Sequence, residues 1–342
     1  MIAALVVVVS AFVISAVLTR QFCDPASQLH FLDHPNERSL HTNPTPRTGG
    51  VAINAGLLVA VVVGLAFSVG MGQLVWLGGA VLLVAGLSFL DDIKGVSVAS
   101  RFIGHMLAAG VVIAEGLILP GLDLPGLAWH WPVWVGVVFT ALYLVWMINL
   151  YNFMDGMDGF AGGMAVVGFG TLAVLGVLTG HFVFFVANLT VAAAAAGFLL
   201  FNFPPARIFM GDTGSSVLGL LAGGLSLWGV VDRVFPFWVA ILTFSPFIVD
   251  ASVTLVRRLL RGERVWQAHK THYYQRLVQL GWGHHKTVVV EYGLMLACGA
   301  SAVLGARVGV TGQWLILIGW CLIYPALMLL VSRLEQRATT PA

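Results

Sequence analysis

Long apolar runs, each about 20 residues, recur along this 342-residue chain and constrain its fold more than any other feature. A run of that length is typical of a helix that crosses a membrane. Charged residues make up only 9% of the chain, whereas soluble domains carry about 25%. We therefore predict an all-α polytopic membrane protein in which residues 1–342 form a single domain.

The apolar runs predict about eleven transmembrane helices. The first run has no basic residues before it and no A-x-A cleavage pattern, so we interpret it as a retained helix rather than a secretory signal. No internal repeat of the kind found in many transporters is visible. The predicted spans are 2–19, 49–69, 73–90, 101–120, 132–150, 159–178, 182–202, 215–232, 236–256, 287–306 and 312–332.

Positive charge distinguishes the two sides of the predicted membrane topology. All Lys and Arg residues except Arg233 and Arg307 fall on one side, in the connections between spans or in the C-terminal tail. By the positive-inside rule this side is cytoplasmic, which places the N-terminus outside and the C-terminus in the cytoplasm. The predicted cytoplasmic loops are 20–48, 91–101, 151–158, 203–214 and 257–286.

Acidic residues gather on the same predicted side. Asp91 and Asp92 end the third span in "FLDDIKG", where they oppose the helix dipole and repel each other unless a cation or a partner compensates. The alternative is a solvated helix end before a turn. In "NLYNFMDGMDGF", capping the next helix needs only one short polar residue, yet Asn149, Asn152, Asp155 and Asp158 supply four. A spacing of three places the first three on one helical face.

The stretch "IFMGDTGSS" sets Asp212 between glycines at the start of another span. Backbone amides there are suited to phosphate oxygens, and the carboxylate is suited to a divalent cation such as Mg²⁺, which prefers hard oxygen ligands. The alternative is an ordinary helix N-cap. Within the ninth span, Asp250 is either a functional carboxylate or a hydrogen-bonded contact between helices.

Two basic loops complete the candidate residues. The first, "HPNERSLHTNPTPRTGG", contains Arg38, His41 and Arg47, and the last contains His269 and His272 at a spacing that shares a helical face. Many of these basic residues serve topology and contact anionic lipid headgroups. The histidine pair lacks a third ligand for zinc, which favours contact with a phosphate instead.

Taken in order, "RSLHTNPTPRTGGVAI", "DDIKG", "NLYNFMDGMDGFAGG" and "FMGDTGS" resemble the motifs of the polyprenyl-phosphate N-acetylhexosamine-1-phosphate transferase superfamily, which includes the MraY, WecA and TagO enzymes. The resemblance implies transfer of a HexNAc-1-phosphate from a UDP-N-acetylhexosamine of GlcNAc, QuiNAc or FucNAc type to undecaprenyl phosphate. UMP would be released at the cytoplasmic face of the bacterial inner membrane. The implied cofactor is Mg²⁺, with Mn²⁺ as a substitute.

The resemblance also assigns roles by motif. The segment "HKTHYYQRL" is similar to the WbpL-type branch, which initiates O-antigen or related glycans. The implied catalytic residues are Asp91, Asp92, His269 and His272; the metal ligands are Asp212 and Asp92; and the substrate-binding residues are Arg38, His41, Arg47, Asn149, Asn152, Asp155, Asp158 and Phe209, of which Phe209 is suited to stacking on uracil.

The expected partners are the UDP-sugar, undecaprenyl phosphate, membrane lipid and, because relatives of this kind often pair, a second copy of the chain. No nucleic acid is expected. An alternative function is a transporter of a polar or anionic solute, which predicts carboxylates near the membrane midplane. Another alternative, a scaffold for other glycan enzymes, predicts that loss of Asp212 leaves glycan synthesis intact.

Overall fold

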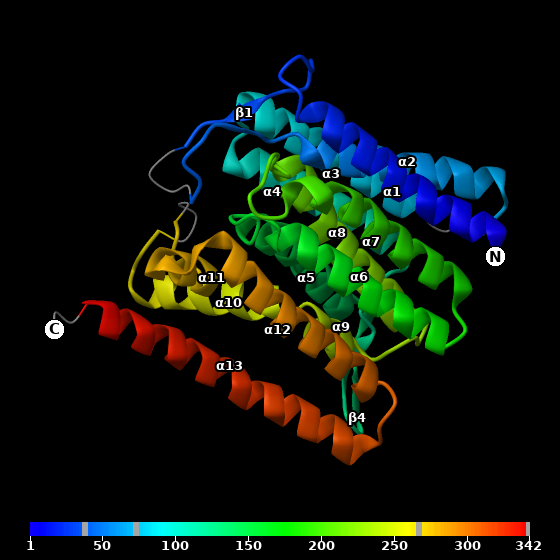
Figure 1. Ribbon diagram of the computed structural model, residues 1–342. Helices are drawn as coiled ribbons and strands as arrows, with labels where there is room; N and C mark the ends of the chain where they lie inside the picture. The colour runs from blue at the N-terminus through cyan, green and yellow to red at the C-terminus, as the bar shows by residue number, and fades with distance from the viewer. Residues whose placement is uncertain (36–39, 71–74, 265–268, 340–342) are drawn as a thin grey trace.

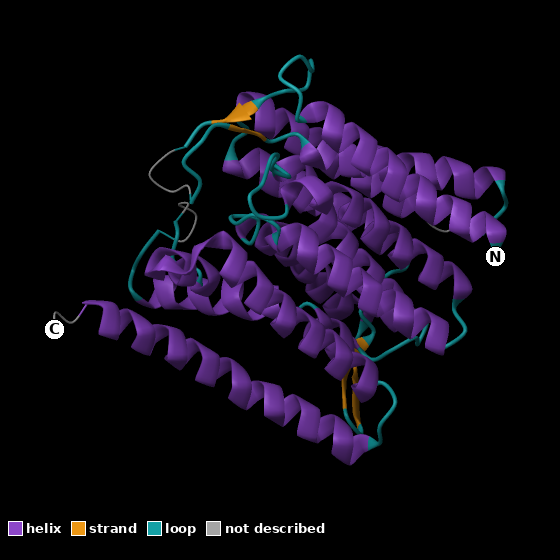
Figure 2. Ribbon diagram, in the orientation of Figure 1, coloured by secondary structure: helices purple, strands orange, loops and turns teal. Residues whose placement is uncertain are grey.

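The computed structural model describes the chain apart from residues 36–39, 71–74, 265–268 and 340–342. Figures 1 and 2 show a bundle of helices with two small antiparallel hairpins, β1 (Leu32–Asp33) with β2 (Thr45–Pro46) and β3 (Gly121–Leu124) with β4 (Leu127–His130). The helices are α1 (Ile2–Phe22), α2 (Gly49–Ala66), α3 (Val75–Lys94), α4 (Val98–Ala114), α5 (Val133–Phe153), α6 (Phe160–Leu178), α7 (Phe182–Asn202), α8 (Asp212–Val231), α9 (Phe237–Thr243), α10 (Ser245–Leu260), α11 (Tyr273–Leu277), the π-helical η2 (Val278–Trp282), α12 (Gly283–Gly305) and α13 (Val310–Thr339).

The prediction of an all-α polytopic membrane protein is confirmed. In the described residues, nine helices are long and apolar enough to cross a membrane, and the pair α9 and α10 makes a tenth candidate span. That pair is bent by 81° at its break, where Pro246 stands in the first turn of α10. Helix α4, at 17 residues, is apolar but shorter than each of these nine helices. The count of eleven crossings stays a prediction, as does the side on which each terminus lies, although Figure 1 places the termini at opposite ends of the bundle.

Helix α8 forms the centre of the bundle and is almost completely buried. It packs closely against α5 because glycines face that helix. A Cβ atom on Gly219 would lie 2.5 Å from the carbonyl oxygen of Met147, and one on Gly223 would lie 2.9 Å from Leu144. Small residues at such positions let helix backbones approach each other. The central position of α8 fixes where its N-terminal residue, Asp212, lies.

The N-terminal end of α2 is joined to the segment that leads into α8. Gly49 N donates to the Phe209 carbonyl at 3.0 Å, Gly50 N donates to the Met210 carbonyl at 2.8 Å, and Phe209 N donates to the Pro46 carbonyl at 2.7 Å. At Gly50 the two backbones nearly touch, since a Cβ atom there would lie 2.1 Å from Gly214 N. This backbone pairing brings the first predicted loop beside the start of α8.

We expect Gly50→Ala to destabilise the protein because the added methyl group would force α2 and α8 apart. Overpacking of this kind costs about 1–3 kcal/mol. Thermal unfolding of the purified protein, followed by tryptophan fluorescence, should show a midpoint several degrees below that of the wild type. Gly79→Ala is the matched control, since a Cβ atom on this α3 residue meets no atom within 4 Å. Equal midpoints for Gly50→Ala and the wild type would contradict the close contact.

Candidate active site

A polar pocket of about 210 Å³ opens at one end of the bundle, and all five predicted cytoplasmic loops contribute to its wall. We call it the aspartate pocket. Its lining combines carboxylates, amides, two histidines and one arginine: Asp33, Leu40, His41, Arg47, Asp92, Asn152, Asp155, Gly156, Met157, Asp158, Asn202, Phe209, Gly211, Asp212, Ser215, Gln275 and His284.

Asp92, near the C-terminal end of α3, caps the N-terminus of α8. Its carboxylate accepts hydrogen bonds from Asp212 N at 3.1 Å, from Thr213 N at 3.0 Å and from the Thr213 hydroxyl at 2.6 Å. A negative charge at a helix N-terminus is favourable, so the contact with α8 compensates for the unfavourable position at the end of α3. The sequence suggested that backbone amides at this helix start hold phosphate oxygens. Two of these amides, Asp212 N and Thr213 N, instead donate to Asp92. The N-cap of α8 is Gly211, so the alternative role of Asp212 as a cap is wrong.

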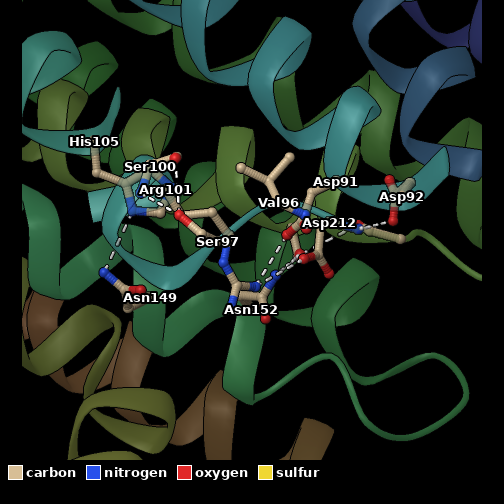
Figure 3. Close-up of polar contacts among 12 residues, drawn as sticks. Asp91, Asp92, Val96, Ser97, Ser100, Arg101, His105, Asn149, Asn152 and Asp212 are labelled. Carbon is tan, nitrogen blue, oxygen red and sulfur yellow. Dashed lines mark hydrogen bonds and ion pairs between the residues drawn. The ribbon is translucent and has the colours of Figure 1, made fainter. Parts of the chain in front are cut away.

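Asp91, the neighbour of Asp92, points to a different set of partners and does not line the pocket. It accepts from Val96 N at 2.6 Å and from Arg101 Nη1 at 3.0 Å. The same Arg101 nitrogen lies 3.7 Å from Asp212 Oδ2, and Figure 3 shows the contacts of this guanidinium with both carboxylates. Asp91 is thus placed to fix Arg101 beside Asp212.

The two asparagines of the fifth span differ in position. Asn152 lines the aspartate pocket, and its Nδ2 donates to the Ser215 hydroxyl at 3.3 Å. Asn149 lies one turn deeper in α5, where its Nδ2 donates to the Val145 carbonyl at 2.7 Å and lies 3.5 Å from His105 Nδ1. Figure 3 shows Asn149 and His105 apart from the carboxylates. The structure therefore brings Asn152, but not Asn149, to the pocket.

Asp155 and Asp158 lie in the turn between α5 and α6. Asp158 accepts from Ala206 N at 2.9 Å and lies 2.9 Å from His284 Nδ1. Burial, followed by repulsion from Asp212, Asp92 and Asp158, raises the pKa of the Asp155 carboxyl well above its usual value. In such surroundings the negative charge of a carboxylate is unfavourable, so binding either a proton or a cation stabilises it.

Residues of the first loop form another part of the pocket wall. The ring centroid of His41 lies 4.8 Å from that of Phe209, and its Nε2 lies 3.6 Å from Asp33 Oδ2. Arg47 Nη1 lies 3.7 Å from Asp33 Oδ1, and its Nη2 donates to the Asp92 carbonyl. Three predicted substrate-binding residues are thus gathered in the pocket, together with Asp33. Arg38 falls outside the described residues.

His269 and His272 do not line the aspartate pocket. His272 is buried, with its Nδ1 3.2 Å from Asp250 Oδ1. Asp250 also accepts from Tyr273 N at 3.0 Å and from Tyr274 N at 3.2 Å, so it anchors the start of α11 and makes a contact between helices. Burial, together with the charges of His272 and Arg258, lowers the pKa of His269 to about 4, which leaves this ring neutral at pH 7. The catalytic roles of the two histidines stay predictions.

His284 and Gln275 reach the pocket although neither was singled out from the sequence. His284 is the first residue of "HHK", which follows "HKTHYYQRL" in the chain. The pair of adjacent histidines just before the predicted span 287–306 was the sequence feature that could have identified it. Gln275 comes from α11, whose Tyr274 hydroxyl donates to the Phe153 carbonyl at 3.4 Å. The last loop therefore contributes Gln275 and His284 to the pocket.

The acidic side chains fit a magnesium ion that shares its coordination with a substrate. No group of three or more His, Cys, Asp or Glu residues in the described part of the chain is arranged to hold a metal by itself. Mg²⁺ is commonly bound by one or two carboxylates together with phosphate and water. Asp212 and Asp155 both line the pocket and repel each other, so they are suited to this role. Because the Asp92 carboxylate already accepts three hydrogen bonds, its role as a ligand stays a prediction.

Comparison with known proteins identifies a consistent set of relatives. The profile of glycosyl transferase family 4 matches residues 73–230. A probable undecaprenyl-phosphate N-acetylglucosaminyl 1-phosphate transferase of Bacillus subtilis is 31% identical over 305 residues, which cover 87% of this chain and 84% of the relative. A decaprenyl-phosphate N-acetylglucosaminephosphotransferase of Mycobacterium leprae is 30% identical, covering 78% and 75%. A phospho-N-acetylmuramoyl-pentapeptide-transferase of Geobacillus thermodenitrificans is 28% identical, covering 84% and 93%.

The hydrogen bonds to Asp92 predict a difference between two substitutions. Asp92→Ala removes every acceptor from the start of α8 and should cost about 0.5–2 kcal/mol, the usual value of a helix cap. Asp92→Asn keeps one acceptor oxygen and should lower the thermal midpoint less. Glu115→Ala, at an exposed site after α4, is the control. If Asp92→Ala unfolds at the wild-type temperature, Asp92 does not cap α8.

Proposed function

Since this chain belongs to the polyprenyl-phosphate hexosamine-1-phosphate transferases of glycosyl transferase family 4, we propose that it transfers HexNAc-1-phosphate from a UDP-N-acetylhexosamine to undecaprenyl phosphate, releasing UMP. The observation that carries this proposal is the convergence of five distant loops on the aspartate pocket. The pocket offers carboxylates for a metal ion and the cation Arg47 for a phosphate.

The reaction needs positioning more than it needs a strong base. The second pKa of a phosphate is about 6, so the acceptor lipid is largely dianionic at pH 7. One of its oxygens forms a bond to the sugar-bearing phosphorus, the bond from that phosphorus to the bridging oxygen breaks, and UMP leaves with the electron pair. Phosphoryl transfer of this kind depends mainly on alignment and on neutralising charge.

The residues of the pocket divide these tasks. Arg47 is held against Asp33 and the Asp92 carbonyl, which fixes a guanidinium for a phosphate group. Asp212 and Asp155 would hold Mg²⁺, which supplies charge neutralisation on the diphosphate when bound. The aromatic wall of His41 and Phe209 is suited to the uracil ring.

The position of the acids supports an enzyme over a transporter. Asp92 lies two residues before the end of α3, Asp212 is the first residue of α8, and Asp155 and Asp158 lie between α5 and α6. These are helix ends rather than the membrane midplane that the transporter alternative predicts. A pocket at helix ends meets a water-soluble nucleotide sugar and a lipid whose tail stays in the bilayer, and we assign it to the cytoplasmic face of the bacterial inner membrane.

The histidine segment "HKTHYYQRL" supports a finer proposal, initiation of O-antigen or a related envelope glycan. The test is UMP release by the purified protein with undecaprenyl phosphate, Mg²⁺ and a panel of UDP-GlcNAc, UDP-QuiNAc, UDP-FucNAc and UDP-MurNAc-pentapeptide. We expect release with at least one of the first three donors and none with the pentapeptide donor. Release with the pentapeptide donor alone would overturn the finer proposal.

Replacement of the pocket carboxylate Asp212 by asparagine should nearly abolish activity. The change keeps the side-chain size but removes the charge proposed to bind the metal, and losses of roughly 10²–10³-fold are typical when an electrostatic group of a transition state is removed. UMP release under saturating substrates is the measurement. Asp123→Asn, in the distant hairpin strand β3, is the control and should keep full activity. Full activity in Asp212→Asn would contradict the proposed role of this carboxylate. It is also the result that the scaffold alternative predicts.

Removal of divalent metal should abolish UMP release reversibly. We expect excess EDTA to stop turnover, and added Mg²⁺, or less effectively Mn²⁺, to restore it, because hard oxygen ligands favour these ions. The half-saturating Mg²⁺ concentration should rise in Asp155→Asn, while the KM for undecaprenyl phosphate changes little. Undiminished turnover in EDTA would exclude the metal from the mechanism.

A further inference from the structure

A second polar cavity, of about 370 Å³, lies at the same end of the bundle and shares no lining residue with the aspartate pocket. It is bounded by the end of α10, by α11 and η2, and by the end of α13. We call it the basic pocket because five cationic side chains line it: Arg257, Arg258, Arg261, Lys270 and Arg276.

Two acidic residues in the basic pocket are already committed to arginines. Glu263 Oε2 accepts from Arg258 Nε at 2.8 Å, and Glu335 Oε1 accepts from Arg276 Nε at 2.6 Å. These pairs hold Arg258, which is buried, and Arg276 in fixed positions. The cavity therefore keeps an excess of positive charge after its own carboxylates have been counted.

Arg257 and Arg261 supply part of that excess. Arg257 Nη1 donates to the hydroxyl of Tyr273 at 2.8 Å, and its guanidinium lies 5.3 Å from the centre of the same ring. Neither Arg257 nor Arg261 has a carboxylate within 4.0 Å among the residues for which the structure gives positions. Guanidinium groups bind phosphate strongly, so these two are suited to an anionic phosphate ligand.

An apolar cavity, also of about 370 Å³, adjoins the basic pocket, since the two are lined by neighbouring residues of α10, α11 and α13. Apart from Asp250 and Glu291 its wall is mostly hydrophobic, and it lies between α10, α11, α12 and α13. The neighbouring residues Leu334 and Glu335 of α13 line the apolar and the basic cavity respectively. Figure 1 shows α13 at the edge of the bundle, and most of its apolar side chains are exposed. A charged pocket next to an apolar one matches a ligand with a phosphate head and a hydrocarbon tail.

We propose that the basic pocket binds the phosphate of an anionic phospholipid headgroup, with an acyl chain in the adjoining apolar cavity. Basic residues at a membrane surface attract anionic lipids by this chemistry. The ligand is distinct from the acceptor substrate because α11 separates the two pockets, with Arg276 facing the basic pocket and Gln275 facing the aspartate pocket. A lipid that holds α11 in place also stabilises one wall of the aspartate pocket.

The test measures phosphatidylglycerol binding to the full chain by native mass spectrometry. Protein is taken from nanodiscs of phosphatidylcholine, with and without phosphatidylglycerol. We expect Arg257→Gln with Arg261→Gln to weaken phosphatidylglycerol binding roughly thirtyfold. Arg333→Gln with Arg337→Gln is the matched control. It also removes two positive charges, from the C-terminal end of α13 that carries Glu335, but neither arginine lines the basic pocket. Equal binding in the two double variants would overturn the proposal.

Three further arms decide the outcome. If the double variant fails to fold, Arg261→Gln alone, at an exposed site, should weaken binding roughly fivefold, and no change there would overturn the proposal. Displacement of phosphatidylglycerol by one equivalent of undecaprenyl phosphate would also overturn it, because the pocket would then belong to the acceptor. Inorganic phosphate that stabilises detergent-purified wild type, but not the double variant, would support the phosphate site while assigning it to a soluble ligand.

Discussion

The contact between the Asp92 carboxylate and the first amides of α8 is the interaction on which the aspartate pocket depends. It joins helices whose contacting residues are more than a hundred positions apart in the chain, and it places a negative charge at the positive end of a buried helix. Arg47 adds the first loop to the same point through the Asp92 carbonyl. One residue therefore sets the relative positions of the three segments that carry Arg47, Asp92 and Asp212.

The last loop gives the molecule two pockets of opposite character, separated by the single short helix α11. Asp250 fixes the start of that helix through two backbone amides, and Tyr274 packs under it against the turn between α5 and α6. The aspartate pocket is suited to a metal-bound diphosphate, whereas the basic pocket is suited to a phosphate group without a metal ion. Opposite charges are kept apart at close range because rigid, buried contacts hold α11 between them.

The helices were predictable from the sequence because apolar runs between charged loops leave few alternatives in a membrane. Each of the eleven predicted spans matches a helix or a helix pair, although the break in 236–256 was missed even though Pro246 was a visible signal. The identity of most pocket residues was also predictable, since short polar motifs at helix ends are rare in so apolar a chain.

The side-chain contacts between residues far apart in the sequence were not predictable. The spacing of three that joined Asn149 to Asn152 holds within α5, but α4 offers Asn149 a different neighbour, His105. The contact of Asp158 with His284 spans more than a hundred residues, so no local pattern reveals it. Such pairings depend on how whole helices pack, which a periodic pattern does not specify.

Helix α13 has a consequence for how the protein responds to its surroundings. Its apolar part, from Val310 to Val331, extends about 33 Å at the rise of an α-helix, close to the roughly 30 Å of hydrocarbon in a typical bilayer. Its few contacts with the bundle include the bond from Arg276 to Glu335, just beyond that apolar part. In a thinner bilayer this apolar part is longer than the hydrocarbon layer, so α13 would tilt and pull on this bond, and hydrophobic mismatch is transmitted directly to α11.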